Sequence, residues 1–312
     1  MNTFTALIKR ELLDGKNGYI RVPAILGALS VFLVIVSTIG FGATIEFDGV
    51  FDSHPEIRNF GEAIDMAANS DKGEHELPAA ITLSYWVMGG ISWVALPFVV
   101  FFSLLSALYE ERRDRSILFW KSMPVADWQE VLAKLITPVV VAPLVFLGVA
   151  VAAQIVIALF LSLVVLFQGG PVLEMWPLGL MFGTWSLFIV HYIMSTLWAL
   201  PLLAWVLFVS SYASRLPFMW AVLPPAVVAA VEAILFETTN FLEWFGTHMG
   251  GWQVRYGNPH VDIDGPSDFL NLVFGETWEA LSYTLANGQF WLGLVIAGGF
   301  VYGAIEMRKR AI

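Results

Sequence analysis

The sequence contains no cysteine and few charged residues, and both shortages limit what the protein can be. Without cysteine there is no disulfide framework and no thiolate chemistry. Charged residues make up only 13% of the 312 residues, whereas soluble domains carry about 25%. With 58% hydrophobic residues and a mean hydropathy of +0.72, the composition is typical of a membrane protein.

Signatures of several enzyme classes are also missing from the sequence. There is no G-x-x-x-x-G-K-[ST] stretch, so the chain has no Walker loop for ATP. Neither G-x-S-x-G nor H-E-x-x-H occurs. The acidic stretches DSHPE and DKGEHE contain His54 and His75, but their spacing matches no defined metal site. We therefore expect no catalytic, cofactor-binding or metal-binding residue, and no enzymatic activity of the chain by itself.

Long apolar runs dominate the remaining sequence. Each run is long enough to cross a hydrocarbon core about 30 Å thick, which predicts an all-α polytopic membrane protein formed by a single transmembrane domain, 1–312. The six predicted spans are 22–43, 81–108, 136–167, 178–210, 218–236 and 288–306. The fourth run exceeds what a bilayer needs, so Pro201 either splits it or lies within one long tilted helix.

Lysine and arginine placement orients these spans, because cytoplasmic segments carry the excess of positive charge. With six spans and a cytoplasmic N-terminus, 13 of these residues fall in inner segments and 3 in outer ones, namely Arg58, Lys72 and Arg255. A seventh span would place the basic residues 308–310 outside. We therefore predict that both termini are cytoplasmic.

Two segments outside the spans have predicted structure of their own. Residues 1–20 predict a short interfacial helix, with Phe4, Leu7, Ile8 and Leu12 on one face. Residues 237–287 predict a structured outer loop that contains two short helices, SDFLNLVF and TWEALSYTL.

Few polar residues lie inside the predicted spans, and such groups are functional candidates by default. The candidates are Gln154, His191 and Glu232. Gln154 and His191 are equally suited to hydrogen bonding between helices, and Glu232 to reaching the outer interface. Pro224-Pro225 is expected to break the fifth span near its middle.

One segment, 109–134, concentrates charge between two uncharged flanks; it reads YEERRDRSILFWKSMPVADWQEVLAK. Its glutamates precede its arginines at spacings that favour ion pairs along a helix. Asp127-x-x-Glu130 is typical of a capping box that opens the next helix. Between them lies the apolar piece 117–120, which needs an apolar groove at the bilayer interface or on a cytoplasmic partner.

The pattern E-R-x-x-x-[ST]-[IL]-x-x-x-x-S-[ML]-P, followed by a helix that ends in lysine, resembles the first cytoplasmic loop of ABC-2 type transporter permeases. The matching residues are Glu111, Arg112, Ser116, Ile117, Ser122, Met123, Pro124 and Lys134. The order of six spans, interfacial helix and large outer loop is also similar to that family. Trp120 and Lys121 depart from the pattern, because small apolar residues are commoner at these two places.

The resemblance implies an ABC exporter subunit in a bacterial inner (plasma) membrane. Such a permease pairs with a second copy or a close paralogue, and the path runs along the dimer interface. Each permease docks on a cytoplasmic ATPase subunit, which binds the ATP and Mg²⁺. The resemblance implies that 109–134 is the coupling loop, with partner contacts at Glu111, Arg112, Arg113, Arg115, Ile117, Leu118, Phe119, Trp120, Met123 and Pro124. Nucleic acid is not expected as a partner.

Other classes of function stay open at this point. A free-standing secondary carrier would use the polar groups in the spans, and a bilayer enzyme would need a reactive cluster that the sequence does not show. A sensor or assembly factor built on the same fold is a third alternative. The sequence does not specify the transported substrate.

Overall fold

The computed structural model describes residues 3–41, 59–249 and 265–311, and within these ranges it contains helices and no strand. The α-helices are α1 (Thr3–Asp14), α2 (Val22–Phe41), α3 (Phe60–Ala68), α4 (Gly73–Gly89), α5 (Leu96–Ala107), α6 (Tyr109–Arg113), α7 (Ile117–Lys121), α8 (Asp127–Ile136), α9 (Ala142–Phe167), α10 (Leu178–Tyr212), α11 (Pro217–Phe236), α12 (Asn240–Met249), α13 (Pro266–Ala286) and α14 (Gly288–Arg310). Short 3₁₀ or π-helical segments are η1 (Asn17–Arg21), η2 (Gly90–Ala95), η3 (Thr137–Val141) and η4 (Val172–Met175).

Six helical stretches in the described part of the chain are long and apolar enough to cross a membrane. They are Asn17–Gly40, Gly73–Arg113, Asp127–Phe167, Val172–Tyr212, Pro217–Phe236 and Gly288–Arg310. The prediction of six helices that are long and apolar enough to span a membrane is therefore confirmed. The second stretch extends beyond the predicted span because α4 begins earlier, at Gly73, and α6 follows α5. The third stretch begins earlier than predicted because η3 joins α8 to α9. As a result, only residues 114–126 separate them, and the rest of the predicted loop 109–134 is helical.

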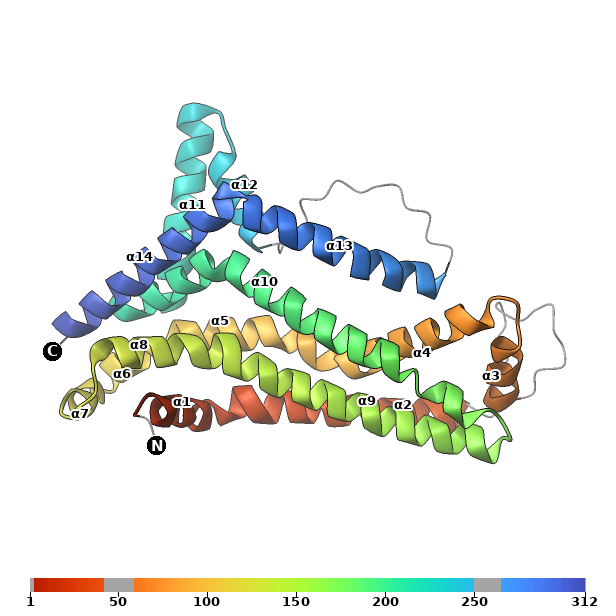
Figure 1. Ribbon diagram of the computed structural model, residues 1–312. Helices are drawn as coiled ribbons and strands as arrows, with labels where there is room; N and C mark the ends of the chain where they lie inside the picture. The colour runs from red at the N-terminus through yellow and green to blue at the C-terminus, as the bar shows by residue number, and fades with distance from the viewer. Residues whose placement is uncertain (1–2, 42–58, 250–264, 312) are drawn as a thin grey trace.

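Helix α10 lies at the centre of the bundle (Figure 1). It packs against α13 and α14, which follow one another along its length, and against α4 and α5. Each of the three hydrophobic clusters contains side chains of α10, including the fully buried Leu207 and the buried Met181 and Trp198. Pro201 lies inside this helix without splitting it. The long apolar run is therefore one helix of 35 residues.

Helix α11 projects from the side of the bundle in Figure 1, and Ala221 is its one buried residue, whereas α12 packs back against α10. The expected break at Pro224-Pro225 is wrong, because α11 continues through both prolines. A proline leaves the carbonyl four residues earlier without its helical N–H. For Pro225 this carbonyl is Ala221 O, and it accepts a hydrogen bond from Trp205 Nε1 at 3.0 Å instead.

The segment predicted as the second outer loop is also more regular than expected. Where the sequence predicts two short helices, α13 runs unbroken for 21 residues. Its first turn is capped by Glu76 of α4, which accepts hydrogen bonds from the backbone N–H and the hydroxyl of Ser267. His54 lies outside the described residues, and His75 lies in α4.

The end of the bundle that holds α1, α6, α7, α8 and the last turn of α14 is called the terminal end below; it is on the left in Figure 1. Here α1 packs against α8. Leu7 is buried and Ile8 and Leu12 are partly buried, whereas Thr5 and Lys9 are exposed. The predicted apolar face of α1 is therefore turned toward the protein.

Two adjacent glycines test the packing of the second span. A Cβ at Gly89 would lie 2.7 Å from Gln154 Cγ, whereas a Cβ at Gly90 would meet no atom nearer than 3.8 Å. We expect Gly89→Ala to lower the free energy of unfolding by about 1–3 kcal/mol, as overpacking does. Gly90→Ala is the matched control and should be neutral or slightly stabilising. Thermal unfolding of both variants in detergent micelles measures the difference, and equal melting temperatures would contradict the close approach of α4 and α9.

Candidate functional site

The charged segment forms a short helical link at the terminal end. Arg115 joins α6 to α7 with a φ of 58°, in the left-handed region. This conformation costs a residue with a side chain about 1–2 kcal/mol, so contacts of the neighbouring residues must hold the turn. Helix α7 has five residues, and the exposed Pro124 lies in the turn that leads to α8.

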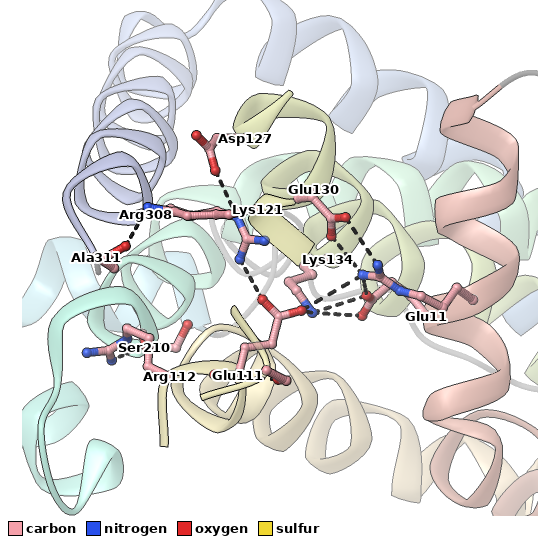
Figure 2. Close-up of polar contacts among 12 residues, drawn as sticks. Glu11, Glu111, Arg112, Lys121, Asp127, Glu130, Lys134, Ser210, Arg308 and Ala311 are labelled. Atoms are coloured by element: carbon pink, nitrogen blue, oxygen red, sulfur yellow. Dashed lines mark hydrogen bonds and ion pairs between the residues drawn. The ribbon is translucent and has the colours of Figure 1, made fainter. Parts of the chain in front are cut away.

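Glu111 lies at the centre of an ion-pair network (Figure 2). Its Oε2 accepts a hydrogen bond from Arg308 Nη1 at 2.5 Å, and its Oε1 lies 3.0 Å from Lys134 Nζ. Lys134 also donates to the two carboxylate oxygens of Glu11 at 3.1 and 3.2 Å. The side chains of Arg308 and Lys134 are only 2% and 5% exposed. These pairs are therefore shielded from water, and the loss of either partner leaves a buried charge uncompensated.

Arg10 and Asp127 complete the network. Arg10 donates to both carboxylate oxygens of Glu130, at 3.1 and 2.7 Å, and also to Glu11. Burial alone would lower the pKa of Arg10, but its bonds to Glu130 and Glu11 raise that pKa above the ordinary value. Arg308 Nε lies 3.2 Å from Asp127 Oδ1. The network therefore connects four elements, α1, α6, α8 and α14.

Three carboxylates of this network are close enough to suit a bound cation. Oxygens of Glu11, Glu111 and Glu130 all lie within 4.8 Å of one another. The cations of the protein itself already occupy this place. Lys134 contacts Glu11 and Glu111, and Arg10 contacts all three, at 3.9 Å in the case of Glu111. The carboxylates are thus neutralised without a metal ion.

The predicted ion pairs within the charged segment are wrong. Arg112 and Arg113 contact other groups instead, in the case of Arg112 because α10 packs against this segment. Arg112 Nη2 donates to the carbonyls of Ser210 and Ala213 at the end of α10, at 2.7 and 2.8 Å. Arg113 is exposed and pairs with the adjacent Asp114 at 3.0 Å.

The predicted capping box at the start of α8 is also wrong. The carboxylates of Asp127 and Glu130 face arginines of α14 and α1 rather than the backbone of their own helix. The side chain of Gln129 performs the capping instead, because its Oε1 accepts from the backbone N–H of Ala126 at 3.3 Å.

The apolar side chains of α7 and of the turn that follows it are of two kinds, those in contact with the protein and those exposed to solvent. Ile117 is 5% exposed and lies under the link. Trp120 is partly buried, and Arg10 Cζ lies 3.9 Å above its ring. Leu118 and Phe119 are 54% and 56% exposed, and Met123 is 39% exposed. Of the predicted apolar contact residues, these last three and Pro124 are exposed and free to meet a partner.

The two polar candidates in the middle of the spans each have a separate partner. Gln154 is 1% exposed, and its Oε1 accepts from Trp185 Nε1 at 2.7 Å. His191 Nε2 lies 2.5 Å from the hydroxyl of Thr277, which itself donates to the carbonyl of Val273. The hydroxyl must therefore accept from His191, which places a proton on Nε2. Both residues connect helices.

Glu232 has a capping role. Its carboxylate accepts from the backbone N–H groups of Asn240 and Phe241, at 3.0 and 2.8 Å, and from the hydroxyl of Thr238 at 2.8 Å. A carboxylate at a helix N-terminus is stabilised by the orphan N–H groups and the helix dipole. The three polar candidates therefore hold three different joints, α9 to α10, α10 to α13 and α11 to α12, and no bond described here connects them.

Sequence patterns missed three of the seven residues of the network. Arg10 and Arg308 belong to the basic residues that are predicted to be cytoplasmic, and nothing in the local spacing of these two or of Glu11 assigns them partners. A signal was present in α8, where Glu130 and Lys134 share a face with the apolar Val131 and Leu135. Two opposite charges on an apolar face indicate buried, paired charges.

Comparisons with known protein families, characterised proteins and solved structures find no match to this chain. The fold itself defines a class, since the described residues are helical and include six helices long and apolar enough to cross a membrane. Function within this class has to be inferred from the geometry of the terminal end.

Proposed function

We propose that the chain is the membrane-spanning permease subunit of an ATP-driven exporter of the ABC-2 type, with α7 as its coupling helix. The observation that carries the proposal is the division of side chains on α7. Ile117 and Trp120 are engaged by the protein, whereas Leu118 and Phe119 are more than half exposed beside Met123. A short helix fixed on one side and apolar on the other suits insertion into a groove of a partner.

In this proposal the terminal end faces the cytoplasm of a bacterial cell, and the six helices cross its inner membrane. The exposed cations of this end, including Lys9, Arg113, Arg115 and Arg310, agree with the rule that cytoplasmic segments are positive. Helix α1 lies at the inner interface, with its polar face toward the lipid headgroups and cytoplasm.

The partner is a separate ATPase subunit that binds ATP and Mg²⁺. Closure of the ATPase displaces α7, and the buried network couples α6 and α8, which flank α7, to α14 through Glu111, Asp127 and Arg308. A buried network of paired charges transmits movement because breaking one of its pairs is costly. A second permease subunit completes the path, and the exposed apolar face of α11 is available for it.

The secondary carrier receives less support. A carrier needs polar groups on a common path so that substrate and ion movement are coupled. Gln154, His191 and Glu232 instead belong to three different joints, and each already has a hydrogen-bonding partner.

Co-purification tests the proposal. We expect the wild-type protein, solubilised in mild detergent, to retain a soluble subunit whose sequence contains a Walker loop. The double variant Leu118→Ala, Phe119→Ala should lose it, because truncating two apolar anchors costs about 2–4 kcal/mol, or at least about 30-fold in Kd. Mass spectrometry of the retained proteins provides the measurement.

The matched control is Phe167→Ala with Leu173→Ala. These side chains are each 86% exposed, on the part of the chain far from α7. This variant should retain the ATPase as the wild type does. If the wild type retains no ATPase, or if the Leu118–Phe119 variant retains as much as the control, the coupling assignment is wrong.

A further inference from the structure

Trp120 and Lys121 are the two residues of the charged segment that depart from the permease pattern, and the structure gives each of them a contact with a distant helix. Arg10 of α1 lies over the ring of Trp120, with its Cζ 3.9 Å from the ring centroid. Lys121 Nζ donates to the carbonyl of Ala311, just after α14 (Figure 2), and to that of Lys309 at 3.0 Å. Consecutive residues of one short helix thus contact the first and the last helix of the described chain.

Both contacts are physically suited to holding a helix in place. A guanidinium over an indole is attracted by the ring quadrupole, and the attraction is stronger where the pair is partly desolvated. The last carbonyls of α14 have no helical partner, and a lysine near them also complements the negative end of the helix dipole. Lys121 therefore caps α14 from outside the helix.

The helices that α7 contacts are themselves fixed by the network. Arg10 is held by Glu130, and α14 is held by Arg308, which contacts Glu111 and Asp127. The network pairs α14 with α6 and α8, the two helices that flank α7. The Lys121 contact pairs α14 with α7 itself. Helix α7 is thus held from one side by α1 and from the other by α14, and the network connects these two helices.

Helix α14 then leads to the centre of the bundle. It packs along α10, and a Cβ at Gly303 would lie 2.8 Å from the ring of Phe208, so the two helices approach closely there. A displacement of α14 therefore cannot be absorbed at this interface by side-chain rearrangement alone.

We propose that Trp120 and Lys121 are positioning residues that clamp α7 between α1 and α14, so that a force on α7 moves α14, and with it α10. Without the clamp, the same force would move α7 within the segment 114–126 and leave α14 in place. The origin of the force rests on the proposed permease function, whereas the clamp is a property of this chain and is tested on this chain alone.

Distance measurements between spin labels test the clamp, and the absence of cysteine allows two labels without any other substitution. One label pair is Ser122→Cys with Tyr302→Cys, which reports on α7 relative to α14. The other is Ser122→Cys with Thr5→Cys, which reports on α7 relative to α1. All three positions are exposed. The purified protein in lipid nanodiscs should give one narrow distance distribution for each pair.

Each contact has its own variant and its own control. Lys121→Met keeps the apolar stem but no donor, and it should cause loss of the single narrow peak for the α7–α14 pair. Lys121→Arg should retain that peak, and Lys121→Gln should give an intermediate width. Trp120→Leu should broaden the α7–α1 pair, whereas Trp120→Phe, which keeps a ring face, should not. Lys309→Met is the control for removal of a lysine at this end.

The outcomes separate the two proposals. Unchanged narrow distributions in both Lys121→Met and Trp120→Leu would overturn the clamp, whatever the co-purification shows. The graded Arg, Gln and Met series at Lys121 still decides the matter if one of its members is not recovered as a monodisperse protein. If the distributions broaden as expected and no ATPase is retained by the wild type, the clamp stands and the permease function falls. If the clamp and the permease function both hold, the Lys121→Met variant should still bind the ATPase but no longer stimulate its ATP hydrolysis. A variant that had only lost docking would not retain the ATPase.

Discussion

Glu111→Gln is expected to lower the free energy of unfolding by about 3 kcal/mol. The substitution keeps the size of the side chain and removes its charge. Arg308 and Lys134, which are 2% and 5% exposed, then each lose a carboxylate in a place that water does not reach. Asp127 and Glu11 still contact these two cations, so the loss falls at the lower end of what breaking a buried ion pair costs.

Glu110→Gln is the matched control for this prediction. Glu110 precedes Glu111, is exposed, and has no ion pair within the described residues. Its substitution should change the free energy of unfolding by less than about 0.5 kcal/mol. Denaturant unfolding in detergent micelles, followed by tryptophan fluorescence, measures both variants. A Glu111→Gln protein as stable as Glu110→Gln would show that the network is solvated and does not hold the terminal end together.

Arg308→Lys is expected to lower the free energy of unfolding by about 2–3 kcal/mol, although it preserves the charge. Arg308 uses two different nitrogens, since Nη1 donates to Glu111 and Nε lies 3.2 Å from Asp127. A lysine has a single nitrogen and cannot span both carboxylates in the same geometry. Either Asp127 is therefore left without this cation, or Glu111 keeps only Lys134.

The exposed Arg310, two residues further along α14, provides the control, and Arg310→Lys should be neutral. A double-mutant cycle with Glu111→Gln adds a second measurement. If Arg308 acts through Glu111, the losses from the two single variants should sum to more than the loss in the double variant. Additive losses, or an Arg308→Lys protein with wild-type stability, would refute a forked contact of Arg308.

The arrangement of spans could be predicted from the sequence because it depends on a local property. A run such as 136–167 is apolar enough to cross a bilayer whatever its neighbours are, so all six helices of this kind were predicted in order. The failures arose where the outcome depends on a neighbour. Pro224-Pro225 suggested a break, but Trp205 from another helix supplies the hydrogen bond that the broken ladder needs.

The difference between local properties and contacts with distant residues also explains which parts of the candidate site could be predicted. Spacing along a helix predicted pairs between residues three or four positions apart, whereas the actual partners of Glu111 include Arg308, 197 positions away. Such a pair depends on how the first and last helices fold back onto the link, and no local pattern contains that information. The exposed apolar pair Leu118 and Phe119 is different, because an apolar stretch between charged residues is visible in the sequence itself.

The network also has a consequence for the order in which the protein is made. Glu111 and Asp127 are synthesised long before Arg308, so both carboxylates emerge from the ribosome without the cation that they finally share. Until α14 is in place, Glu111 has Lys134 but not Arg308, and Asp127 lacks the cation that it contacts in the network, so the Asp127 carboxylate must remain hydrated. Addition of α14 thus supplies Arg308 to both carboxylates and excludes water from this end of the protein. A chain that ended before Arg308 would leave the Asp127 carboxylate without this cation and exposed to water, and we expect it to be more sensitive to proteolysis.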